Sequence, residues 1–158
     1  KNGIPSARMV LLKAFDETGF TFFTNYESRK GKELLENPFA SLLFWWREFE
    51  RQVRIEGKIE KINSKDSEEY FNLRPLKSRY GALSSNQSEF IESREVLEKR
   101  FLDLEKQFGD KPPTPENWGG YKLIPKKFEF WQGRRDRLHD RICYEKVKDD
   151  WKIYRLQP

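Results

Sequence analysis

Apolar and polar residues alternate along much of this chain, and a period of two residues is typical of strands that bury one face. In RQVRIEGKIEKI, residues 51–62, polar Gln52, Arg54 and Glu56 alternate with apolar Val53 and Ile55. Other segments are apolar runs rich in aromatic residues, which also favour strands. The predicted strands are Arg8–Phe15, Phe20–Asn25, 39–46, 51–62, Tyr121–Trp131, Arg141–Glu145 and Trp151–Leu156.

Two short helices are predicted between the early strands. Ser28 can cap a helix that continues to Leu35, and Ser64 can cap one that continues to Arg74. Pro75 disfavours continuation of the second helix, because proline restricts the residue before it and lacks an N–H. Residues 76–90, LKSRYGALSSNQSEF, follow as a predicted loop.

A third helix has the clearest apolar face. It begins at Ser93 and ends where Gly109 provides a stop. The residues spaced for one buried face are Leu97, Phe101, Leu104 and Phe108.

Strands and helices do not alternate regularly, which predicts an antiparallel barrel with helices packed outside it. The segment DETG, Asp16–Gly19, predicts a hairpin turn between the first two strands. The fold class is therefore mainly β, or α+β, and aromatic residues make up 15% of the chain, enough for an aromatic core. At 158 residues we expect a single domain, 1–158.

The composition narrows the possible ligands. A net charge of +5, spread along the chain, suits anionic ligands but does not by itself indicate nucleic acid. One cysteine and one histidine exclude an internal disulfide and an ordinary zinc site, so we expect a reducing compartment and no metal. The sequence contains no apolar run of membrane-spanning length and starts without a signal-peptide core, so we expect a cytoplasmic protein that does not bind membranes. An apparent core strand so near the first residue suggests that the natural chain begins earlier.

One group of residues has donors suited to a phosphate ester. Tyr70 and Arg74 are four residues apart on a predicted helix and share a face, and Ser78 follows the break at Pro75. A phenol, a guanidinium and a hydroxyl can all donate hydrogen bonds to phosphate oxygens. Spacing alone favours the simpler alternative, an aromatic and a cation on a solvated helix surface.

Three cations near the amino terminus are also candidates for binding an anion. Lys13 shares a predicted strand face with Met9 and Leu11, although it can simply be the solvated end of that strand. Arg29 and Lys30 lie in the first turn of a predicted helix, where cations oppose the macrodipole unless an anion shares the site.

The stretch FWQGRRDRLHDR, Phe130–Arg141, contains four arginines and the only histidine. In an extended conformation Arg137 and His139 would point one way while Leu138 packs the other. The guanidinium would disfavour the cationic imidazole and leave a neutral group suited to a heteroaromatic ring. An ordinary surface network of arginines with Asp136 and Asp140 is the alternative.

Together, the motifs RMVLLK, FFTNYESRKGKEL, RQVRIEG, YFNLRP, NQS, WGGY, EFWQG and RLHDR, with the ending WKIYRLQP, closely resemble the pyridoxamine 5′-phosphate oxidase family over essentially the whole chain. The resemblance implies an FMN-dependent homodimer with a split β-barrel fold and the flavin at the subunit interface. The family usually carries an N-terminal extension before PSARMVLLK, which we expect this chain to lack.

By resemblance, the FMN contacts divide between the two subunits. One group is Arg8, Met9, Val10, Leu11, Lys13, Phe23, Thr24, Arg29, Lys30 and Gln52, and the other is Gln87, Ser88, Trp131 and Arg141. The positions that match the substrate-binding ones are Lys13, Tyr70, Arg74 and Ser78 for the phosphate and Arg137, Leu138 and His139 for the pyridine ring. Arg137 would cover and orient the ring for hydride transfer and His139 would make a polar contact, neither as an essential acid or base. Arg134 and Arg135 would lie outside the site.

The implied reaction oxidises pyridoxamine 5′-phosphate or pyridoxine 5′-phosphate to pyridoxal 5′-phosphate, with O2 as acceptor and hydrogen peroxide as product; the amine also releases ammonia. A nucleic-acid-binding β-barrel that stacks bases on aromatic residues is an alternative of another class, although it would not need RMVLLK or RLHDR. A flavoprotein with another substrate is the nearer alternative.

Overall fold

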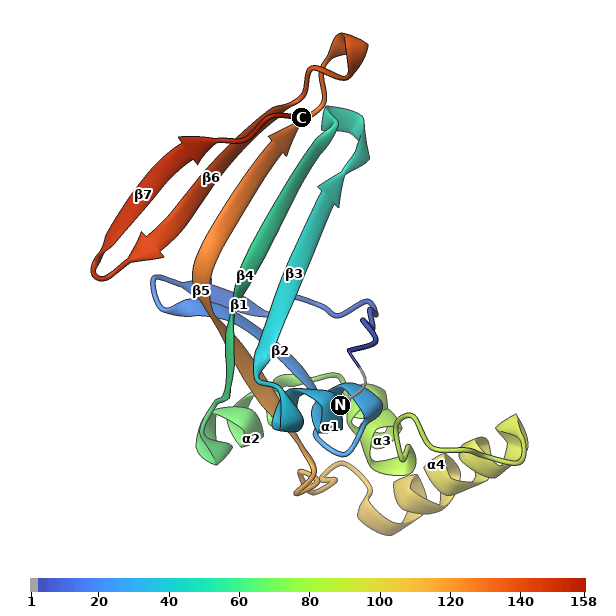
Figure 1. The fold of residues 1–158 in the computed structure, drawn as a ribbon. Coiled ribbons are helices and arrows are strands. Elements are labelled where there is room, and N and C mark those ends of the chain that lie inside the picture. The colour runs from blue at the N-terminus through green and yellow to red at the C-terminus, as the bar shows by residue number, and fades with distance from the viewer. Residues whose placement is uncertain (1–2) are drawn as a thin grey trace. The chain divides into compact units, whose positions relative to one another are not determined.

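The computed structural model describes residues 3–158. Within that range the chain forms seven strands, four α-helices and two short 3-10 segments (Figure 1). The strands are β1 Ala14–Asp16, β2 Gly19–Asn25, β3 Phe39–Trp46, β4 Arg51–Lys61, β5 Trp118–Gln132, β6 Asp140–Val147 and β7 Asp150–Arg155. The helices are α1 Arg29–Glu36, α2 Ser64–Leu73, α3 Leu76–Ser84 and α4 Arg94–Phe108, with 3-10 segments η1 Arg47–Phe49 and η2 Arg135–Arg137.

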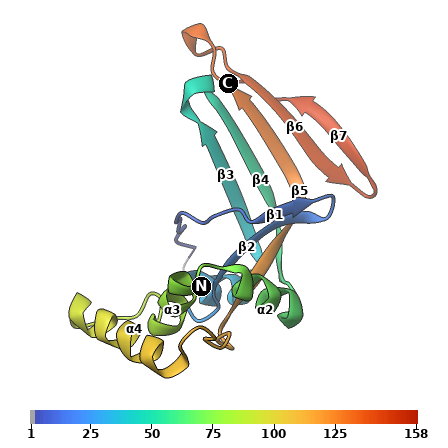
Figure 2. The ribbon, with the colours of Figure 1, turned by 180° about the vertical axis from the view of Figure 1, so that it is seen from behind.

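The strand order is β1-β2-β5-β4-β3, and β6 pairs with both β5 and β7. The pairs β3 with β4, β5 with β6, and β6 with β7 are antiparallel. Figure 2 shows β6 and β7 as a hairpin that continues beside β5. The expectation of a mainly β fold with an antiparallel sheet is confirmed.

Contacts between Cα atoms group the chain into two compact units. The first contains residues 3–14, 21–37 and 61–122, with all four α-helices; the second contains 15–20, 38–60 and 123–158. The prediction of one domain over 1–158 stays a prediction. No helix in the part of the chain that the structure describes is long and apolar enough to cross a membrane.

The first unit has an aromatic core. Phe22, Phe71, Tyr80, Trp118 and Tyr121 are all buried. The side chain of Tyr80, on α3, meets the ring of Phe101 on α4 at 5.7 Å, and its hydroxyl donates to the carbonyl of Gly109 at 2.7 Å. These contacts hold α3 against α4 and use the apolar face that the sequence predicted for α4.

The second unit has its core between the long strands. Ile55 and Ile59 of β4, Leu123 of β5 and Cys143 of β6 are buried. Gly57 of β4 lies so close to the carbonyl oxygen of Ile124 that a Cβ there would clash with backbone. The alternating pattern of residues 51–62 therefore does form a strand with one buried face, as predicted.

Two of the predicted helices are confirmed nearly to the residue. Ser28 caps α1, and its Oγ accepts a hydrogen bond from the Gly31 N–H at 3.3 Å. Ser93 precedes α4, and Gly109 ends it with a φ of 57°, a left-handed value that glycine adopts without strain.

The predicted strand Arg8–Phe15 is wrong for most of its length. Strand β1 covers only Ala14–Asp16, preceded by a single backbone hydrogen bond from Lys13 N to Thr21 O. Met9 is 96% exposed and Leu11 is also exposed, so the apolar pattern does not mark a core strand of this chain. Two of the later strands are longer than predicted: β5 begins at Trp118 and ends at Gln132, and β6 begins at Asp140 and ends at Val147, whereas β7 has the predicted length but begins and ends one residue earlier.

The region around Pro75 differs from the expectation in two ways. The residue that caps α2 is Asn63, whose Oδ1 accepts from the Asp66 N–H at 2.7 Å, and Ser64 is the first helical residue. Residues 76–84 form helix α3 and not a loop. Pro75 ends one helix and begins the next, because proline at a helix start needs no N–H.

Candidate functional site

The first unit contains a buried lysine. Lys30 is 7% exposed, and its Nζ donates to Thr24 Oγ1 at 2.5 Å, Ser28 Oγ at 3.4 Å and Gln87 Oε1 at 3.3 Å. Within the described residues these partners are all uncharged oxygens. Burial lowers the pKa of Lys30 from its ordinary value, and the charge of Arg8 lowers it further. A buried ammonium without a carboxylate is costly unless an anion joins it.

Two arginines surround the same helix start. Arg8 Nη2 and Arg29 Nε each lie 2.8 Å from a carboxylate oxygen of Glu33, and Ser6 Oγ donates to Glu33 at 2.6 Å. These hydrogen bonds lower the pKa of Glu33 to about 2, so the carboxylate is charged at neutral pH. With Lys30, this gives three cations against one carboxylate.

The first turn of α1 packs closely against the backbone of Tyr26. Gly31 packs against the backbone carbonyl of Tyr26, where a Cβ would clash. The helix start has no acidic residue, and its free N–H groups and dipole favour an anion. Together with Lys30, Arg8 and Arg29, this is a donor set that suits a phosphate monoester.

The structure brings Tyr70 and Arg74 together as the sequence predicted. Arg74 caps the end of α2, and its guanidinium lies 4.8 Å from the ring centroid of Trp118. Arg74 Nη1 is buried without a hydrogen-bond partner. Burial lowers the pKa of Arg74 from its ordinary value, and proximity to Tyr70 opposes that shift. An orphaned, buried guanidinium nitrogen is a donor available to an anion.

Lys13 and Tyr70 line a pocket in the first unit. Its volume is about 240 Å³, and its other lining residues are Ala14, Thr21, Phe23, Ile62, Asp66 and Lys122. Lys13 and Tyr70 are thus brought to one pocket, whereas Arg74 and Ser78 are not among its lining residues. Ser78 is exposed in the first turn of α3, where its N–H donates to the Pro75 carbonyl.

The remaining predicted flavin contacts of the first unit are placed as follows. Val10 is half-buried, whereas Met9, Leu11 and Ser88 are exposed. Thr24 is buried and holds Lys30, and the Phe23 ring packs inside the unit against Tyr70. Their roles as flavin contacts stay predictions.

In the second unit, Arg141 is held by a buried carboxylate. Glu129, on β5, is 3% exposed and accepts from Arg141 Nε at 3.2 Å, Arg141 Nη2 at 2.9 Å and Arg54 Nη2 at 2.7 Å. Burial alone would raise the pKa of Glu129, but the hydrogen bond from Arg141 and the charges of Arg54 and Arg141 lower it overall. Arg141 Nη1 also donates to the Gln157 carbonyl at 3.1 Å.

The expectation of an extended RLHDR segment is wrong. Asp136 and Arg137 have φ values of 55° and 61°, so η2 and its surroundings form a turn. Arg137 is exposed, and Leu138, expected to pack inward, is 70% exposed. The turn is closed by hydrogen bonds from Arg134 N to His139 Nδ1 at 3.1 Å and from Leu138 N to Arg135 O.

His139 faces an aromatic side chain, whereas Asp140 belongs to an ion-pair network. The His139 ring lies 4.7 Å from Trp131, which in turn lies 6.0 Å from Trp45. Asp140 pairs with Arg134 at 2.8 Å and with Arg155, so the alternative of a surface network is confirmed for Asp140.

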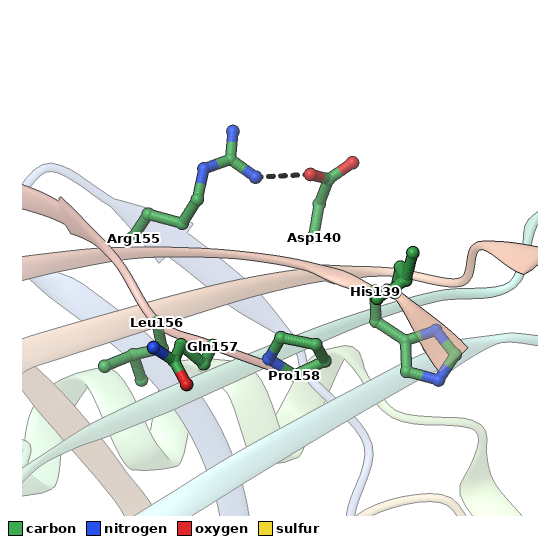
Figure 3. A pocket seen from close by; sticks show the side chains of 7 residues that line it. His139, Asp140, Arg155, Leu156, Gln157 and Pro158 are labelled. Carbon is green, nitrogen blue, oxygen red and sulfur yellow. Dashed lines mark hydrogen bonds and ion pairs between the residues drawn. The ribbon is translucent and has the colours of Figure 1, made fainter. Parts of the chain in front are cut away.

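A pocket of about 310 Å³ lies at the end of the second unit, between the RLHDR segment and the carboxyl terminus. Figure 3 shows Asp140 and Arg155 facing each other, with His139 and Pro158 on the opposite side of the strands. The other residues that line this pocket are Leu138, Leu156 and Gln157.

Gln52, another predicted flavin contact, is half-buried on β4, on the same strand face as Arg54.

Three residues that hold the arginines of these sites were not expected from the sequence: Glu129, Arg54 and Trp118. Glu129 lies between aromatic residues in EFWQG, and an acidic side chain within a predicted core strand could have indicated a buried partner for an arginine. Arg54 was noted only for its place in a polar pattern. Trp118 had no signal beyond the motif WGGY, because its contact with Arg74 depends on the tertiary fold.

This chain is similar in sequence to a known protein family. A pyridoxamine 5′-phosphate oxidase model matches residues 1–108, and a model of the pyridoxine 5′-phosphate oxidase C-terminal dimerisation region matches residues 118–158. A pyridoxine/pyridoxamine 5′-phosphate oxidase of Paraburkholderia phytofirmans is 59% identical over 99% of this chain and 74% of its own length. The protein of that name from Trichormus variabilis is 58% identical with the same coverage.

Two solved structures share the fold. PhzG from Burkholderia lata, in complex with tetrahydrophenazine-1-carboxylic acid, has a TM-score of 0.91 and 35% identity over 97% of this chain and 75% of its own. A pyridoxamine 5′-phosphate oxidase-related, FMN-binding protein from Nostoc punctiforme has a TM-score of 0.76 at 17% identity, covering 99% of this chain and 82% of its own. On the two family models and the sequence relatives, the chain belongs to the pyridoxamine 5′-phosphate oxidase family.

Proposed function

We propose that the protein is an FMN-dependent homodimeric oxidase that converts pyridoxamine 5′-phosphate or pyridoxine 5′-phosphate to pyridoxal 5′-phosphate, with O2 as acceptor and hydrogen peroxide as product. The observation that supports this best is two cations of the first unit for which the described residues show no carboxylate partner. Lys30 is buried, and Arg74 is half-buried with its Nη1 atom buried and unpartnered. The proposed reaction brings two phosphates, one on the cofactor and one on the substrate.

The residues around Lys30 fit the phosphate of FMN. Lys30, Arg8 and Arg29 provide positive charge, and the first turn of α1 adds N–H groups and a favourable dipole. Thr24 and Gln87 already hold the Lys30 ammonium in place. When bound, FMN supplies the two-electron acceptor, which no side chain of this protein can provide.

The residues around Arg74 fit the phosphate of the substrate. Arg74 offers an unpaired donor, and Tyr70 and Lys13 share a pocket. A rigid substrate held at its phosphate has its other end fixed in direction, so these residues can orient the reacting C4′ carbon without touching it. Arg137 and His139 are proposed to contact the pyridine ring and to exclude water from it.

The electron balance requires no further co-reactant. Oxidation at C4′ removes a hydride and a proton from the alcohol or amine, and O2 takes the two electrons and two protons to become hydrogen peroxide. With the amine, water replaces the nitrogen and ammonia leaves.

A homodimer is supported by the match of residues 118–158 to a dimerisation region and by the exposed apolar side chains of the chain. Phe39, Leu43 and Trp45 lie on one face of β3 and are all exposed. Met9 and Leu11 are exposed as well. Contiguous exposed aromatic and aliphatic residues are typical of surfaces that another chain covers.

PhzG provides the nearest alternative. The ligand in its structure is a carboxylic acid named without a phosphate. A protein for such a ligand would not need a second unpaired cation beside Lys30, so the unpartnered Nη1 of Arg74 favours a phosphate ester as substrate here.

The test begins with an absorption spectrum of the purified protein, followed by anaerobic addition of pyridoxamine 5′-phosphate to the protein loaded with FMN. We expect the visible flavin band to bleach and to return when air is admitted, with formation of hydrogen peroxide. Pyridoxamine, which lacks the phosphate, is the matched control and should bleach the band only at much higher concentration. Flavin that binds but stays oxidised would reject the proposed substrates, and failure to bind flavin would reject the cofactor.

A further inference from the structure

Trp118 lies at the start of β5, and its ring is in contact with the guanidinium of Arg74. It is 8% exposed, and the centre of the guanidinium lies 4.8 Å from the centroid of its ring. The centroid of the Phe71 ring lies 5.7 Å from the centre of the same guanidinium. A cation at this distance from an indole ring is attracted by the negative charge of the ring face, and tryptophan gives the strongest such attraction.

The same tryptophan belongs to a stack that also contains the phenol of Tyr70. The Phe23 ring lies 4.0 Å from Tyr70 and 5.3 Å from Trp118, with interplanar angles of 20° and 14°. Tyr70 and Trp118 are nearly parallel, at 6° and 6.3 Å. The stack therefore fixes two donor side chains, the Tyr70 phenol directly and the Arg74 guanidinium through the face of Trp118.

Arg74 needs such support because at least one of its nitrogens makes no hydrogen bond. Buried arginines are normally held by carboxylates or carbonyls, but Nη1 of Arg74 has no partner in the described part of the chain. A carboxylate in that position would compete with an incoming phosphate. An aromatic face attracts the guanidinium through its charge and accepts none of the N–H groups in a conventional hydrogen bond, so Nη1 keeps its donors for an anion.

We propose that Trp118 is a positioning residue for phosphate recognition, which holds the Arg74 guanidinium with its donors free to receive the phosphate of the substrate. The inference rests on the proposed function in that it names how the substrate phosphate is held. Trp118 does not touch the reacting atoms, so its effect is on phosphate affinity and not on the chemical step.

The first test measures binding without turnover. Inorganic phosphate is titrated by calorimetry into the FMN-loaded wild type, Trp118→Leu and Trp118→Phe. Loss of the indole face should weaken phosphate binding roughly tenfold in Trp118→Leu, while Trp118→Phe, which keeps a smaller aromatic face, loses only about threefold. Equal affinity in the wild type and Trp118→Leu, or no phosphate binding by the wild type, would overturn the proposal.

The second test separates positioning from general loss of packing. In an Arg74→Leu background, Trp118→Leu should cause almost no further loss of phosphate affinity, because two residues that act through one contact are not additive. Phe101→Leu is the matched control, since it removes a half-buried aromatic side chain of the same unit, one that contacts Tyr80. Additive losses, or an equal loss in Phe101→Leu, would show that Trp118 contributes only packing.

Steady-state oxidation keeps this inference distinct from the proposed function. Trp118→Leu should raise KM for pyridoxamine 5′-phosphate roughly tenfold with kcat nearly unchanged, and should leave KM for pyridoxamine unchanged. A wild type that binds phosphate through Trp118 and Arg74 but oxidises neither substrate would refute the proposed function and leave the inference standing. Equal rises in KM for pyridoxamine 5′-phosphate and for pyridoxamine would refute the inference about Trp118 and leave the proposed function standing.

Discussion

Lys30 and Arg137 are both cations that the proposed function places against a bound ligand, yet the chain holds them very differently. Lys30 is buried and makes three hydrogen bonds to side chains of three separate segments. Arg137 is exposed and follows another left-handed residue in a turn. The first arrangement is set before any ligand arrives, whereas the side chain of the second is free to move.

This difference in burial suits the two side chains to different roles in ligand binding. A buried cation in a fixed network loses little entropy on binding and suits an anchor for a ligand that stays bound. An exposed arginine in a strained turn loses conformational entropy each time it closes on a ligand, which weakens binding. Weaker binding suits a substrate that must enter and a product that must leave. The anchor is therefore expected to determine affinity for the cofactor, and the turn to determine handling of the substrate.

The largest expected effect follows removal of the anchor. Lys30→Met should weaken FMN binding roughly 100-fold, because a charge-assisted hydrogen bond to phosphate is lost. A titration that follows quenching of flavin fluorescence measures this. Lys32→Met, on the exposed side of the same helix, is the control and should change the affinity less than about twofold. Similar losses in both variants would mean that only overall charge matters.

The second effect concerns the carboxylate behind Arg141. Glu129→Gln should lower the free energy of unfolding by about 2 kcal/mol, less than for a fully buried pair, because Arg54 and Arg141 are partly exposed. Because the pKa of Glu129 is lower in the folded protein than its ordinary value of 4.5, the ionised carboxylate stabilises the fold at pH values above 4.5. This stabilisation is lost as the pH falls below 4.5 and through the lowered pKa.

Urea denaturation of the apoprotein at pH 7 and at acidic pH tests this linkage. The difference between wild type and Glu129→Gln should shrink as the pH falls, because protonation removes the same charge from the wild type. A difference that stays constant with pH would show that the carboxylate contributes only through packing.

The third effect tests the mobile side of the comparison. Arg137→Ala should slow anaerobic flavin reduction and weaken substrate binding, together roughly tenfold, while FMN stays bound. Arg141→Ala should instead lower FMN affinity. Stopped-flow reduction and flavin fluorescence measure the two quantities separately, and Arg135→Ala is the neighbouring control. Unchanged reduction kinetics in Arg137→Ala would contradict its role.

The smallest effect is expected at Ser78. Its hydroxyl is exposed at the start of α3, so Ser78→Ala should raise KM for pyridoxamine 5′-phosphate about threefold, the value of one neutral hydrogen bond. Ser64→Ala, at the start of α2, is the control for a serine in a first helical turn. A rise in KM as large as that of Arg74→Leu would show that Ser78 is a main anchor.

Several elements of the fold were readable from the sequence because their causes are local. Ser28, Gly109 and the alternation in residues 51–62 act through neighbouring backbone and a repeating pattern, and the structure confirms each. Helix α3 was missed because its nine residues, Leu76–Ser84, include Gly81 and have no strong apolar face. The prediction of a strand at Arg8–Phe15 was wrong because an apolar pattern indicates that side chains are buried but not whether the same chain or another molecule buries them.

The sequence by itself determined the family, the mainly β class and the residue types that can bind two phosphates, since these follow from motifs and local patterns. Only the tertiary structure decided that Lys30 is buried among uncharged oxygens, that Glu129 holds Arg54 and Arg141, and that Trp118 lies under Arg74. These contacts join residues up to 75 positions apart. Their energies depend on burial and on distance in space, which neither spacing along the chain nor composition contains.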